Sequence, residues 1–397
     1  MELEKQYLLQ NYGRYPLVLA RGKGCYVYDT AGKRYLDLIT GIGVNALGHA
    51  HPQLLKIIRQ QAGLMVHSSN LYYNLYQGPL AERIVKLSGL DRVFFCNSGT
   101  ESNECALKMV RAHGRKIHAD KFETVAVEGS FHGRTFGALS ITGQEKYRRD
   151  FEPMLPGARF VPRNNLNALE QAVTDRTAGI FLEVVQGEGG IYPMNADFIR
   201  KARALADRHD ALLVLDEIQC GVGRPGTYFA YQMLEPAVMP DVMVAAKPLA
   251  CGLPLAFVAA NERAAQSIAA GQHGTTFGGG PLACRVALEF FDILDGLLPH
   301  IVHMGGYFRM RLTELARKYS FIKEIRGFGL MIGLELDFSG KQIVLDAMEA
   351  GILINCTHDV VLRMLPPYII TEPEADRAVK VLDKVLKKAK PLPVEAH

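Results

Sequence analysis

The sequence predicts an α/β protein with a mostly parallel sheet, and three observations lead to this fold class. Short apolar runs of strand length alternate with amphipathic helical stretches from about residue 50 to residue 280. This alternation is typical of a parallel sheet with helices on both faces. The chain has 397 residues, 48% of them hydrophobic. Because so long a chain exceeds what a single core holds, we expect two or more well-buried lobes.

The strands expected in the main sheet are the successive apolar runs of the first two thirds of the chain. They lie at residues 92–96, 124–127, 159–161, 179–185, 211–218, 241–246 and 256–260. The helices expected around them lie at residues 52–64, 77–87, 101–113, 166–173 and 196–209. Ligands of such sheets bind at the carboxyl ends of the strands, so residues that follow these runs are the first candidates for a site.

The rhythm changes after residue 280. Helices are expected at residues 281–294, 300–319, 341–350 and 372–388, mixed with strands at 325–335, 352–355 and 360–365. We interpret this region as a smaller α/β domain, joined by a hairpin-like segment at 24–37. The expected division is 1–46, a segment packing with the small domain, then a large ligand-binding domain at 47–285 and a small C-terminal domain at 286–397. Residues from 391 onward are expected to form a loose tail.

Composition and charge exclude several classes of function. The net charge is +4 and no basic cluster is dense enough to indicate nucleic-acid binding. No apolar run reaches the roughly 18 to 20 residues that span a bilayer, and the polar N-terminus lacks the apolar core of a signal peptide. The seven cysteines are scattered and the twelve histidines show no ligand spacing, so neither disulfides nor a metal site is expected. We predict a cytoplasmic protein.

Two apolar runs end in residues with complementary chemistry. Asp216 follows one run and Lys247 follows another. Such a carboxylate and amine fit what pyridoxal 5'-phosphate needs, since the amine forms an imine with the aldehyde carbon and the carboxylate keeps a proton on the pyridine nitrogen. A buried ion pair, or a lysine whose stem lies along apolar surface, is the structural alternative. The pair alone leaves both interpretations open.

A turn after the run at 92–96 supplies a candidate anion site. Ser98, Gly99 and Thr100 lead into the helix expected at 101–113. Backbone N–H groups at a helix N-terminus, flanked by hydroxyls, suit one phosphate group. The same residues, with Glu101 in the first turn, are equally typical of an ordinary helix cap. No Walker-type loop is present, which argues against nucleotide binding at this turn.

Together these segments resemble the class III (ornithine-type) pyridoxal-phosphate-dependent aminotransferases. The resemblance extends from Gly22 to Pro367, and seven blocks carry it in order. They are residues 41–49, 97–101, 131–134, 183–190, 216–219, 247 and 273–279. The family implies fold type I: a large cofactor domain built on a mostly parallel sheet, and a smaller α/β C-terminal domain.

The resemblance implies roles for the candidate cofactor residues. Lys247 matches the Schiff-base lysine, which also moves the proton during transfer, and Asp216 matches the partner of the pyridinium nitrogen. Pro248 and Ala250 depart from the family pattern beside this lysine. The other implied contacts are Ser98, Gly99 and Thr100 with the phosphate, Phe131 with the ring face, Glu183 behind the ring, Gln219 with the phenolic oxygen, and Thr276 with the phosphate of the other subunit.

Three charged residues match substrate-binding positions of the family. Arg134 matches the arginine that binds the α-carboxylate of the ornithine-type substrate and the distal carboxylate of glutamate. Arg363 matches the arginine that takes the α-carboxylate of glutamate, and Glu188 matches the acid that neutralises it while the ω-amine donor is bound. Planar guanidinium groups suit carboxylates. An ordinary salt bridge between Glu188 and Arg363 is the structural alternative.

The activity implied is transfer of the δ-amino group of N2-acetyl-L-ornithine to 2-oxoglutarate, as in arginine biosynthesis. The block at 41–45 favours an acylated donor, because free-ornithine enzymes carry a tyrosine there that receives the α-amine. A homodimer with shared active sites is implied by Thr276, and no nucleic acid or membrane partner is expected. Transamination of succinylornithine, N-succinyl-diaminopimelate or 4-aminobutyrate, an aminomutase activity, and a non-catalytic role are the alternatives.

Overall fold

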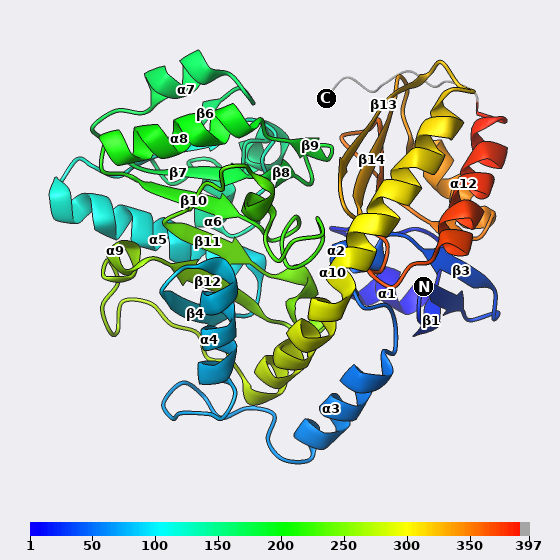
Figure 1. Cartoon of the computed structure of the whole chain (residues 1–397), viewed down its shortest axis with the longest axis horizontal. Coiled ribbons are helices and arrows are strands. Elements are labelled where there is room, and N and C mark those ends of the chain that lie inside the picture. The colour runs from blue at the N-terminus through cyan, green and yellow to red at the C-terminus, as the bar shows by residue number, and fades with distance from the viewer. Residues whose placement is uncertain (390–397) are drawn as a thin grey trace.

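The computed structural model describes residues 1–389, which form one large sheet region and a second region of two smaller sheets (Figure 1). The long helix α10 (Pro281–Ala316) runs between them and packs against elements of both. The tail expected from residue 391 lies outside the described residues. Within residues 1–389, no helix is long and apolar enough to cross a membrane.

The main sheet has seven strands in the order β4-β12-β11-β10-β7-β5-β6. Their bounds are β4 Arg92–Cys96, β5 Glu123–Val127, β6 Ala158–Val161, β7 Thr177–Glu183, β10 Leu212–Asp216, β11 Val242–Ala245 and β12 Ala256–Ala260. Only β12 runs antiparallel to its neighbours in this sheet, which lies within the described residues. The predicted mostly parallel α/β sheet is therefore confirmed, and the carboxyl ends of β4, β5, β7, β10 and β11 meet at one edge.

Helices cover both faces of this sheet. They are α4 (Gln77–Ser88), α5 (Gly99–Ile117), α6 (Phe136–Ser140), α7 (Leu166–Ala172), α8 (Ala196–Arg208) and α9 (Glu262–Ala265). Figure 1 shows α7 and α8 on one side of the sheet and α5 on the other. The strands read as continuous apolar runs because helices bury them from both sides, as all the residues of β7 and β10 are buried.

The second region contains two four-stranded sheets. One has the order β13-β14-β17-β16, and the other β1-β2-β3-β15. Their strands are β1 Leu19–Lys23, β2 Tyr26–Asp29, β3 Arg34–Asp37, β13 Ile322–Phe328, β14 Met331–Leu336, β15 Ile352–Leu353, β16 Asn355–Thr357 and β17 Val361–Met364. The hairpin expected at 24–37 is β2 and β3. Because β15 pairs with β3, the C-terminal part of the chain completes a sheet begun near the N-terminus.

The remaining elements are short or lie outside the sheets. They are α1 Glu2–Tyr7, α2 Thr40–Gly43, α3 Pro52–Ala62, β8 Val185–Gln186, β9 Tyr192–Pro193, α11 Lys341–Glu349 and α12 Glu372–Leu386. The division predicted at residues 46 and 285 stays a prediction, and α10 crosses its second boundary.

Two predictions in the C-terminal part are wrong in detail. The helices expected at 281–294 and 300–319 are the single helix α10, which continues through Pro299. Its buried face continues on both sides of the proline, with Leu294 before it and Ile301 and Met304 after it. This packing offsets the roughly 3 kcal/mol that an interior proline costs.

The second correction concerns the strands expected at 325–335 and 352–355. The first is a hairpin, β13 and β14, that turns at Gly329, whose φ of 49° lies in the left-handed region. The second divides into β15 and β16, which belong to different sheets. A turn inside an apolar run leaves no polar break, so the spacing of apolar residues does not reveal it.

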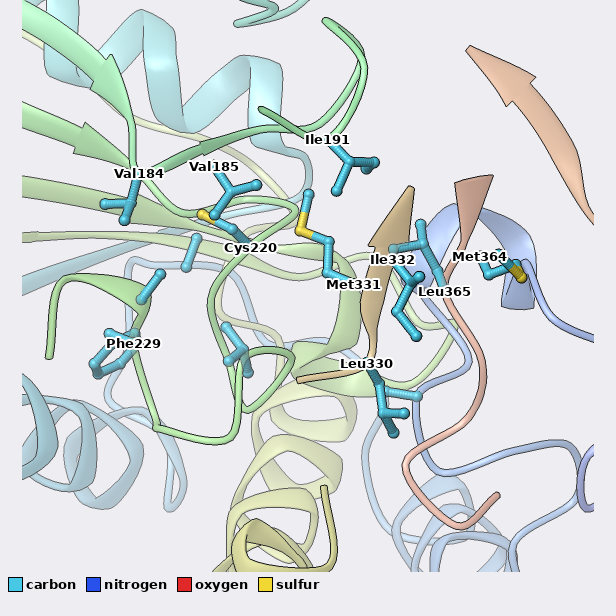
Figure 2. Packing of buried hydrophobic residues seen from close by; sticks show 14 of the residues in the cluster. Val184, Val185, Ile191, Cys220, Phe229, Leu330, Met331, Ile332, Met364 and Leu365 are labelled. Carbon is cyan, nitrogen blue, oxygen red and sulfur yellow. The ribbon is translucent and has the colours of Figure 1, made fainter. Parts of the chain in front are cut away.

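One buried apolar cluster extends from the main sheet into the β13-β14-β17-β16 sheet. Val184 and Val185, which directly follow β7, belong to it together with Ile332 of β14 (Figure 2). Ile191, which follows β8 in the sequence, belongs to the same cluster and is fully buried. The segment after β7 is therefore packed against the C-terminal sheet, and this segment carries part of the candidate site.

Candidate active site

A cavity of about 520 Å³ lies where the parallel strands of the main sheet end. Its volume falls within the range of small-molecule sites. Ten predicted site residues line it: Ser98, Gly99, Thr100, Phe131, Arg134, Glu183, Glu188, Asp216, Gln219 and Lys247. Arg363 lies behind Glu188, and Thr276 is exposed elsewhere. The fold thus brings together side chains from Ser98 to Arg363, which are separated by about two thirds of the sequence.

Lys247 enters the cavity directly after β11, in a short 3-10 turn that includes Pro248 and Ala250. Its backbone φ is 35°, a value that residues other than glycine and asparagine rarely adopt. Such backbone strain is concentrated at functional sites. No hydrogen bond or ion pair of its amine is found within residues 1–389. Loss of hydration on burial lowers the pKa of the Lys247 amine, and the nearby Arg363 lowers it further, while Glu188 and Asp216 oppose the shift.

Asp216 ends β10 and is held by three donors. Its Oδ2 accepts a hydrogen bond from Asn103 Nδ2 at 2.8 Å and lies 2.7 Å from His132 Nδ1. Its Oδ1 accepts from the backbone N–H of Ile218 at 3.0 Å. Burial lowers the pKa of His132, but its hydrogen bond to Asp216 and the charge of that carboxylate outweigh this and leave the pKa raised. The carboxylate is therefore fixed in orientation at the cavity wall.

Asn103 and His132 are functional candidates that the sequence analysis missed. Asn103 lies in α5 and also donates to the His132 carbonyl at 2.7 Å, and both residues are almost fully buried. The signal was present, because His132 sits inside the block at 131–134 and Asn103 follows the block at 97–101. A carboxylate at a buried strand end needs polar partners, and Asn103 and His132 supply them to Asp216.

The Ser98–Thr100 turn serves as a helix cap and also faces the cavity. Ser98 Oγ accepts from the Glu101 N–H at 3.4 Å, and the Glu101 carboxylate accepts from the Ser98 N–H at 3.1 Å, which completes a capping box. The N–H groups of Gly99 and Thr100 lie in the first turn, where no intrahelical carbonyl accepts from them. A Cβ on Gly99 would lie 2.6 Å from the Ile218 side chain, so this approach requires glycine.

Phe131 and Glu183 are joined by the backbone. The Phe131 N–H donates to Glu183 Oε1 at 2.9 Å, and the Gly187 N–H donates to Glu183 Oε2 at 2.9 Å. Burial raises the pKa of Glu183, and the negative charge of Asp216 adds to the rise, although His132 opposes it. The Arg134 guanidinium lies 4.0 Å from the centre of the Tyr147 ring, next to Phe131 at the cavity mouth.

Glu188, Gln219 and Arg363 form one hydrogen-bonded group. Arg363 Nη1 donates to Glu188 Oε1 at 2.5 Å and to Gln219 Oε1 at 3.0 Å, and Gln219 Nε2 donates to Glu188 Oε1 at 3.1 Å. Arg363 is 1% exposed. Burial raises the pKa of Glu188, but the Arg363 charge outweighs it and holds the pKa below its usual value. The Glu188–Arg363 pair is therefore present at the cavity wall.

Thr276 makes no contact with the cavity of its own chain. It is exposed, whereas its neighbour Thr275 accepts a hydrogen bond from Asn97 Nδ2 at 3.1 Å. The resemblance assigned Thr276 to the site of another subunit, so its exposure in this chain does not test that role.

The donor set of the cavity fits pyridoxal 5'-phosphate. An amine without a hydrogen-bond partner lines the same cavity as a fixed carboxylate, and the first turn of α5 offers two free N–H groups. These groups match an aldehyde, a ring nitrogen and a phosphate. Within residues 1–389 no group of His, Cys, Asp or Glu side chains is arranged to hold a metal ion.

Comparison with known proteins identifies relatives along nearly the whole chain. Residues 7–386 match the family model described as aminotransferase class III. The chain is 46% identical over 393 residues to the acetylornithine aminotransferase of Methanocaldococcus jannaschii, covering 98% of each chain. It is 45% identical to the acetylornithine aminotransferase of Aquifex aeolicus, covering 96% of this chain and all of the relative.

Solved structures of similar fold include two kinds of aminotransferase. The ornithine aminotransferase from Toxoplasma gondii superposes with a TM-score of 0.92 at 32% identity, covering 97% of this chain and 94% of that one. The N-acetylornithine aminotransferase from Stenotrophomonas maltophilia superposes with a TM-score of 0.84 at 34% identity, covering 97% and 98%.

Proposed function

The chain belongs to the class III aminotransferases, and we propose that it transfers the δ-amino group of N2-acetyl-L-ornithine to 2-oxoglutarate. The products are N-acetyl-L-glutamate 5-semialdehyde and L-glutamate. The observation that carries this proposal is the cavity in which Lys247 and Asp216 meet at neighbouring strand ends. The curated relatives at 45% and 46% identity support the acylated donor.

Pyridoxal 5'-phosphate, when bound, supplies an electrophilic aldehyde and a ring that accepts electrons. Lys247 would hold the aldehyde, and its amine, when free, would take a proton from the carbon that bears the transferred amino group. The lowered pKa of Lys247 favours the neutral amine, which is the form that can do both. Asp216 would keep a proton on the ring nitrogen, while Asn103 and His132 hold its carboxylate in place.

The other predicted contacts follow the shape of the cavity. The N–H groups of Gly99 and Thr100, with the Ser98 hydroxyl nearby, would bind the phosphate. Phe131 would lie against the ring, with Glu183 fixing its backbone, and Gln219 would donate to the phenolic oxygen. Each role is a proposal that rests on the family resemblance and on the position of the side chain.

We propose that Arg363 and Glu188 act as a switch between the two amine donors. With Glu188 bound, Arg363 is neutralised and the site accepts a donor whose transferred end carries no carboxylate. Glutamate displaces Glu188 and places its α-carboxylate on Arg363, while Arg134 binds the other carboxylate. In Glu188→Ala the half-reaction of glutamate should therefore gain over that of N-acetylornithine by roughly 1 to 3 kcal/mol.

The test of the function is a panel of amines reacted with the pyridoxal form. The expected result is rapid amine transfer from N-acetylornithine and glutamate, and slower transfer from free ornithine and 4-aminobutyrate. Succinylornithine and N-succinyl-diaminopimelate measure the acyl preference, and glutamate-1-semialdehyde tests aminomutase activity. Borohydride should fix the cofactor to the peptide that contains Lys247. Label on another lysine would overturn the mechanism.

We also propose a cytoplasmic homodimer with shared active sites. Large apolar side chains are exposed on one stretch of sequence and beside Thr276: Leu64, Met65, Val66, Leu71, Tyr72, Tyr73, Leu75 and Phe277. So many exposed apolar side chains close together in the sequence are typical of a surface that a second subunit covers. All seven cysteines are free thiols, which suits a reducing compartment.

A further inference from the structure

The loop that carries Glu188 has an unusual backbone. It comprises residues 187–191, between β8 and β9. Gly190 has a φ of 111° and Ile191 a φ of 55°. A positive φ is an outlier for a β-branched residue, and such strain persists only where the surroundings hold it. The contacts of this loop therefore show what holds it.

Side chains from outside the loop hold its backbone at three residues, which are Gly187, Glu188 and Gly190. The Gly187 N–H donates to Glu183 Oε2 at 2.9 Å. Thr357 Oγ1, from β16, donates to the carbonyl of Glu188 at 2.6 Å. The carbonyl of Gly190 accepts two bonds from the side chain of Arg326 on β13, from Nε at 2.9 Å and Nη2 at 2.7 Å. Two of the three anchors thus come from the same sheet that carries Arg363.

Apolar packing reinforces these bonds. Ile191 is fully buried and lies toward Met331 and Ile332 of β14 in Figure 2. A Cβ on Gly333 of β14 would lie 3.0 Å from the Ile191 Cβ, so the two backbones approach closely. The strained residue of the loop is therefore clamped against the C-terminal sheet.

The Arg326 anchor is itself rigid. Its side chain is 4% exposed, and Nη1 pairs with Glu335 and, at 2.8 Å, with Glu324. Its guanidinium carbon lies 3.6 Å from the centre of the Tyr192 ring, whose hydroxyl donates to Glu335 at 2.8 Å. The Arg163 guanidinium lies at the same distance from that ring. Because the Arg326 side chain is buried, paired with two carboxylates and in contact with the Tyr192 ring, it holds the Gly190 carbonyl in one position.

We propose that Thr357 and Arg326 are positioning residues that immobilise the backbone of the 187–191 loop, so that the Glu188 carboxylate leaves Arg363 only by rotation of its own side chain. This inference rests on the proposed switch between donors. If either anchor is lost, Glu188 can withdraw together with its loop. Arg363 then becomes available to a substrate carboxylate more often, and the preference shifts toward glutamate.

The test uses Thr357, because an isosteric change removes one anchor and leaves the packing. Thr357→Val loses the hydroxyl, whereas Thr357→Ser keeps it and is the matched control. The ratio of kcat/KM for glutamate to that for N-acetylornithine, measured in separate half-reactions, should rise about threefold to tenfold in Thr357→Val, which corresponds to one ordinary hydrogen bond. In Thr357→Ser the ratio should stay at the wild-type value.

A second background separates positioning from general damage. In Glu188→Ala there is no carboxylate to position, so adding Thr357→Val should leave the ratio unchanged. A Thr357→Val effect that persists in this background, or that lowers both half-reactions equally, overturns the inference. Should Thr357→Val fold poorly, Arg326→Lys gives the same test, because lysine keeps the charge but cannot make the paired bonds to Gly190.

The outcome also distinguishes this inference from the proposed function. If no amine of the panel reacts with the wild-type enzyme, the proposed function fails and the inference fails with it. If N-acetylornithine reacts but Glu188→Ala leaves the donor ratio unchanged, the function stands and the inference is overturned. If Glu188→Ala changes the ratio and Thr357→Val does not, the switch stands and its positioning by Thr357 is wrong.

Discussion

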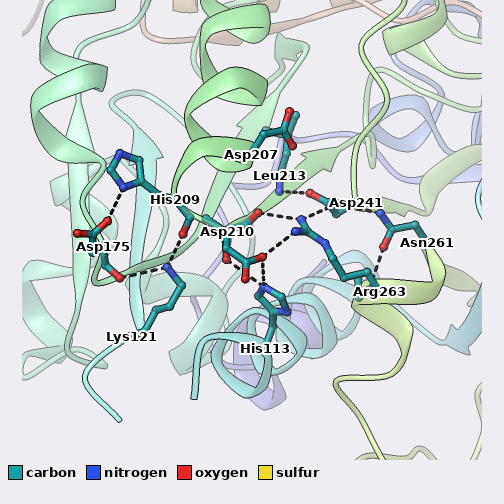
Figure 3. Close-up of polar contacts among 12 residues, drawn as sticks. His113, Lys121, Asp175, Asp207, His209, Asp210, Leu213, Asp241, Asn261 and Arg263 are labelled. Atoms are coloured by element: carbon teal, nitrogen blue, oxygen red, sulfur yellow. Dashed lines mark hydrogen bonds and ion pairs between the residues drawn. The ribbon is translucent and has the colours of Figure 1, made fainter. Parts of the chain in front are cut away.

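The main sheet carries buried charge at both ends of its strands, and the two ends differ in how that charge is satisfied. At the amino ends, Asp241 accepts bonds from Arg263 at 3.0 Å and from Asn261 and the Leu213 N–H at 2.8 Å each (Figure 3). It also accepts a bond from Arg203 at 2.7 Å. Four donors for one carboxylate, two of them cationic, leave no capacity for a ligand. The hydrogen bonds of Asp241 join β10 to α8 and α9, so its role is structural.

At the carboxyl ends the same kinds of side chain surround a cavity. The amine of Lys247 has no hydrogen-bond partner within residues 1–389, and burial holds its pKa low. Glu183 and Glu217 are buried close to Asp216, and burial raises the pKa of both acids. Buried charge that its own chain leaves incompletely paired is costly unless a ligand completes it. Both ends of the sheet carry buried charge. The amino ends are structural because their charged groups have all their partners, and the carboxyl ends are functional because theirs do not.

The largest expected effect tests the functional end. Asp216→Asn keeps the shape of the side chain but removes the negative charge that holds a proton on the ring nitrogen. The mutant should retain cofactor and lose about 1,000-fold in turnover, or about 4 kcal/mol of transition-state stabilisation. Rapid-quench half-reactions give the rate, and the absorbance of the bound cofactor is the control. Turnover within tenfold of wild type would remove Asp216 from this role.

The next effect tests the structural end. Asp241→Asn leaves Arg203 and Arg263 without their shared carboxylate, while the rate of the folded enzyme should not change. Because both arginines are partly exposed, we expect a loss of about 2 to 3 kcal/mol in the free energy of unfolding, below the full cost of breaking a buried pair. Urea unfolding measures it.

Asp207→Asn is the matched control for Asp241→Asn. Asp207 pairs with the same Arg203 at 2.6 Å but its side chain is 63% exposed. Its loss should cost no more than about 1 kcal/mol, as for other surface pairs. Equal costs for the two variants would contradict the view that Asp241 is the saturated centre of this end.

The two ends should also respond to pH in opposite directions. Burial raises the pKa of Glu217 to about 8, although the N–H groups of Ala230 and Tyr231 donate to it. The folded state then holds a proton that the unfolded state releases, so stability falls as pH rises from about 4.5 to about 8, by at most about 1.4 kcal/mol per pH unit. Glu217→Gln should remove this fall, as measured by urea unfolding at pH 5 to 8.

Asp241 supplies the contrast in sign. Burial raises the pKa of its carboxyl, but the charges of Arg203 and Arg263 outweigh burial and leave it below its usual value of 3.8. Its contribution is therefore present above that pH and lost as the pH falls further. Between pH 5 and 8, Asp241→Asn should shift stability by a constant amount. A constant difference between wild type and Glu217→Gln across that range would contradict the raised pKa.

Much of the fold followed from the sequence because each main-sheet strand is a buried apolar run. The strands predicted at 92–96 and 256–260 match β4 and β12 at both ends. The antiparallel direction of β12 did not follow, because a run buried on both faces has the same pattern in either direction. The hairpin at Gly329 and the helix through Pro299 were missed because tertiary packing outweighs the local signals.

The candidate site divides in the same way. Lys247 and Asp216 were predictable because strand ends and chemistry can be recognised locally. Asn103 and His132 lie inside or beside the resembling blocks, but their contacts with Asp216 did not follow, because these contacts span 113 and 84 residues of sequence. The anchors of Glu188 are more distant still, with Thr357 169 residues away. Composition and the spacing of apolar residues do not show which side chains meet over such separations.

The smallest expected effect concerns Thr276, which belongs to neither end of the sheet within its own chain. If the 273–279 loop crosses to a second subunit, Thr276→Ala should weaken retention of the cofactor phosphate about fivefold, the value of one hydrogen bond. Dialysis against phosphate buffer, followed by the absorbance of bound cofactor, measures this. Thr275→Ala is the control, because Thr275 bonds to Asn97 of its own chain.

A mixed dimer of Thr276→Ala with the inactive Lys247→Ala decides which subunit supplies Thr276 to a site. One of its two sites then has both Lys247 and Thr276, so full retention should return at that site. Retention of the cofactor that stays weak in the mixed dimer would place Thr276 outside the shared site. The charged groups at the carboxyl ends of the strands would then be paired only by their own chain and the cofactor.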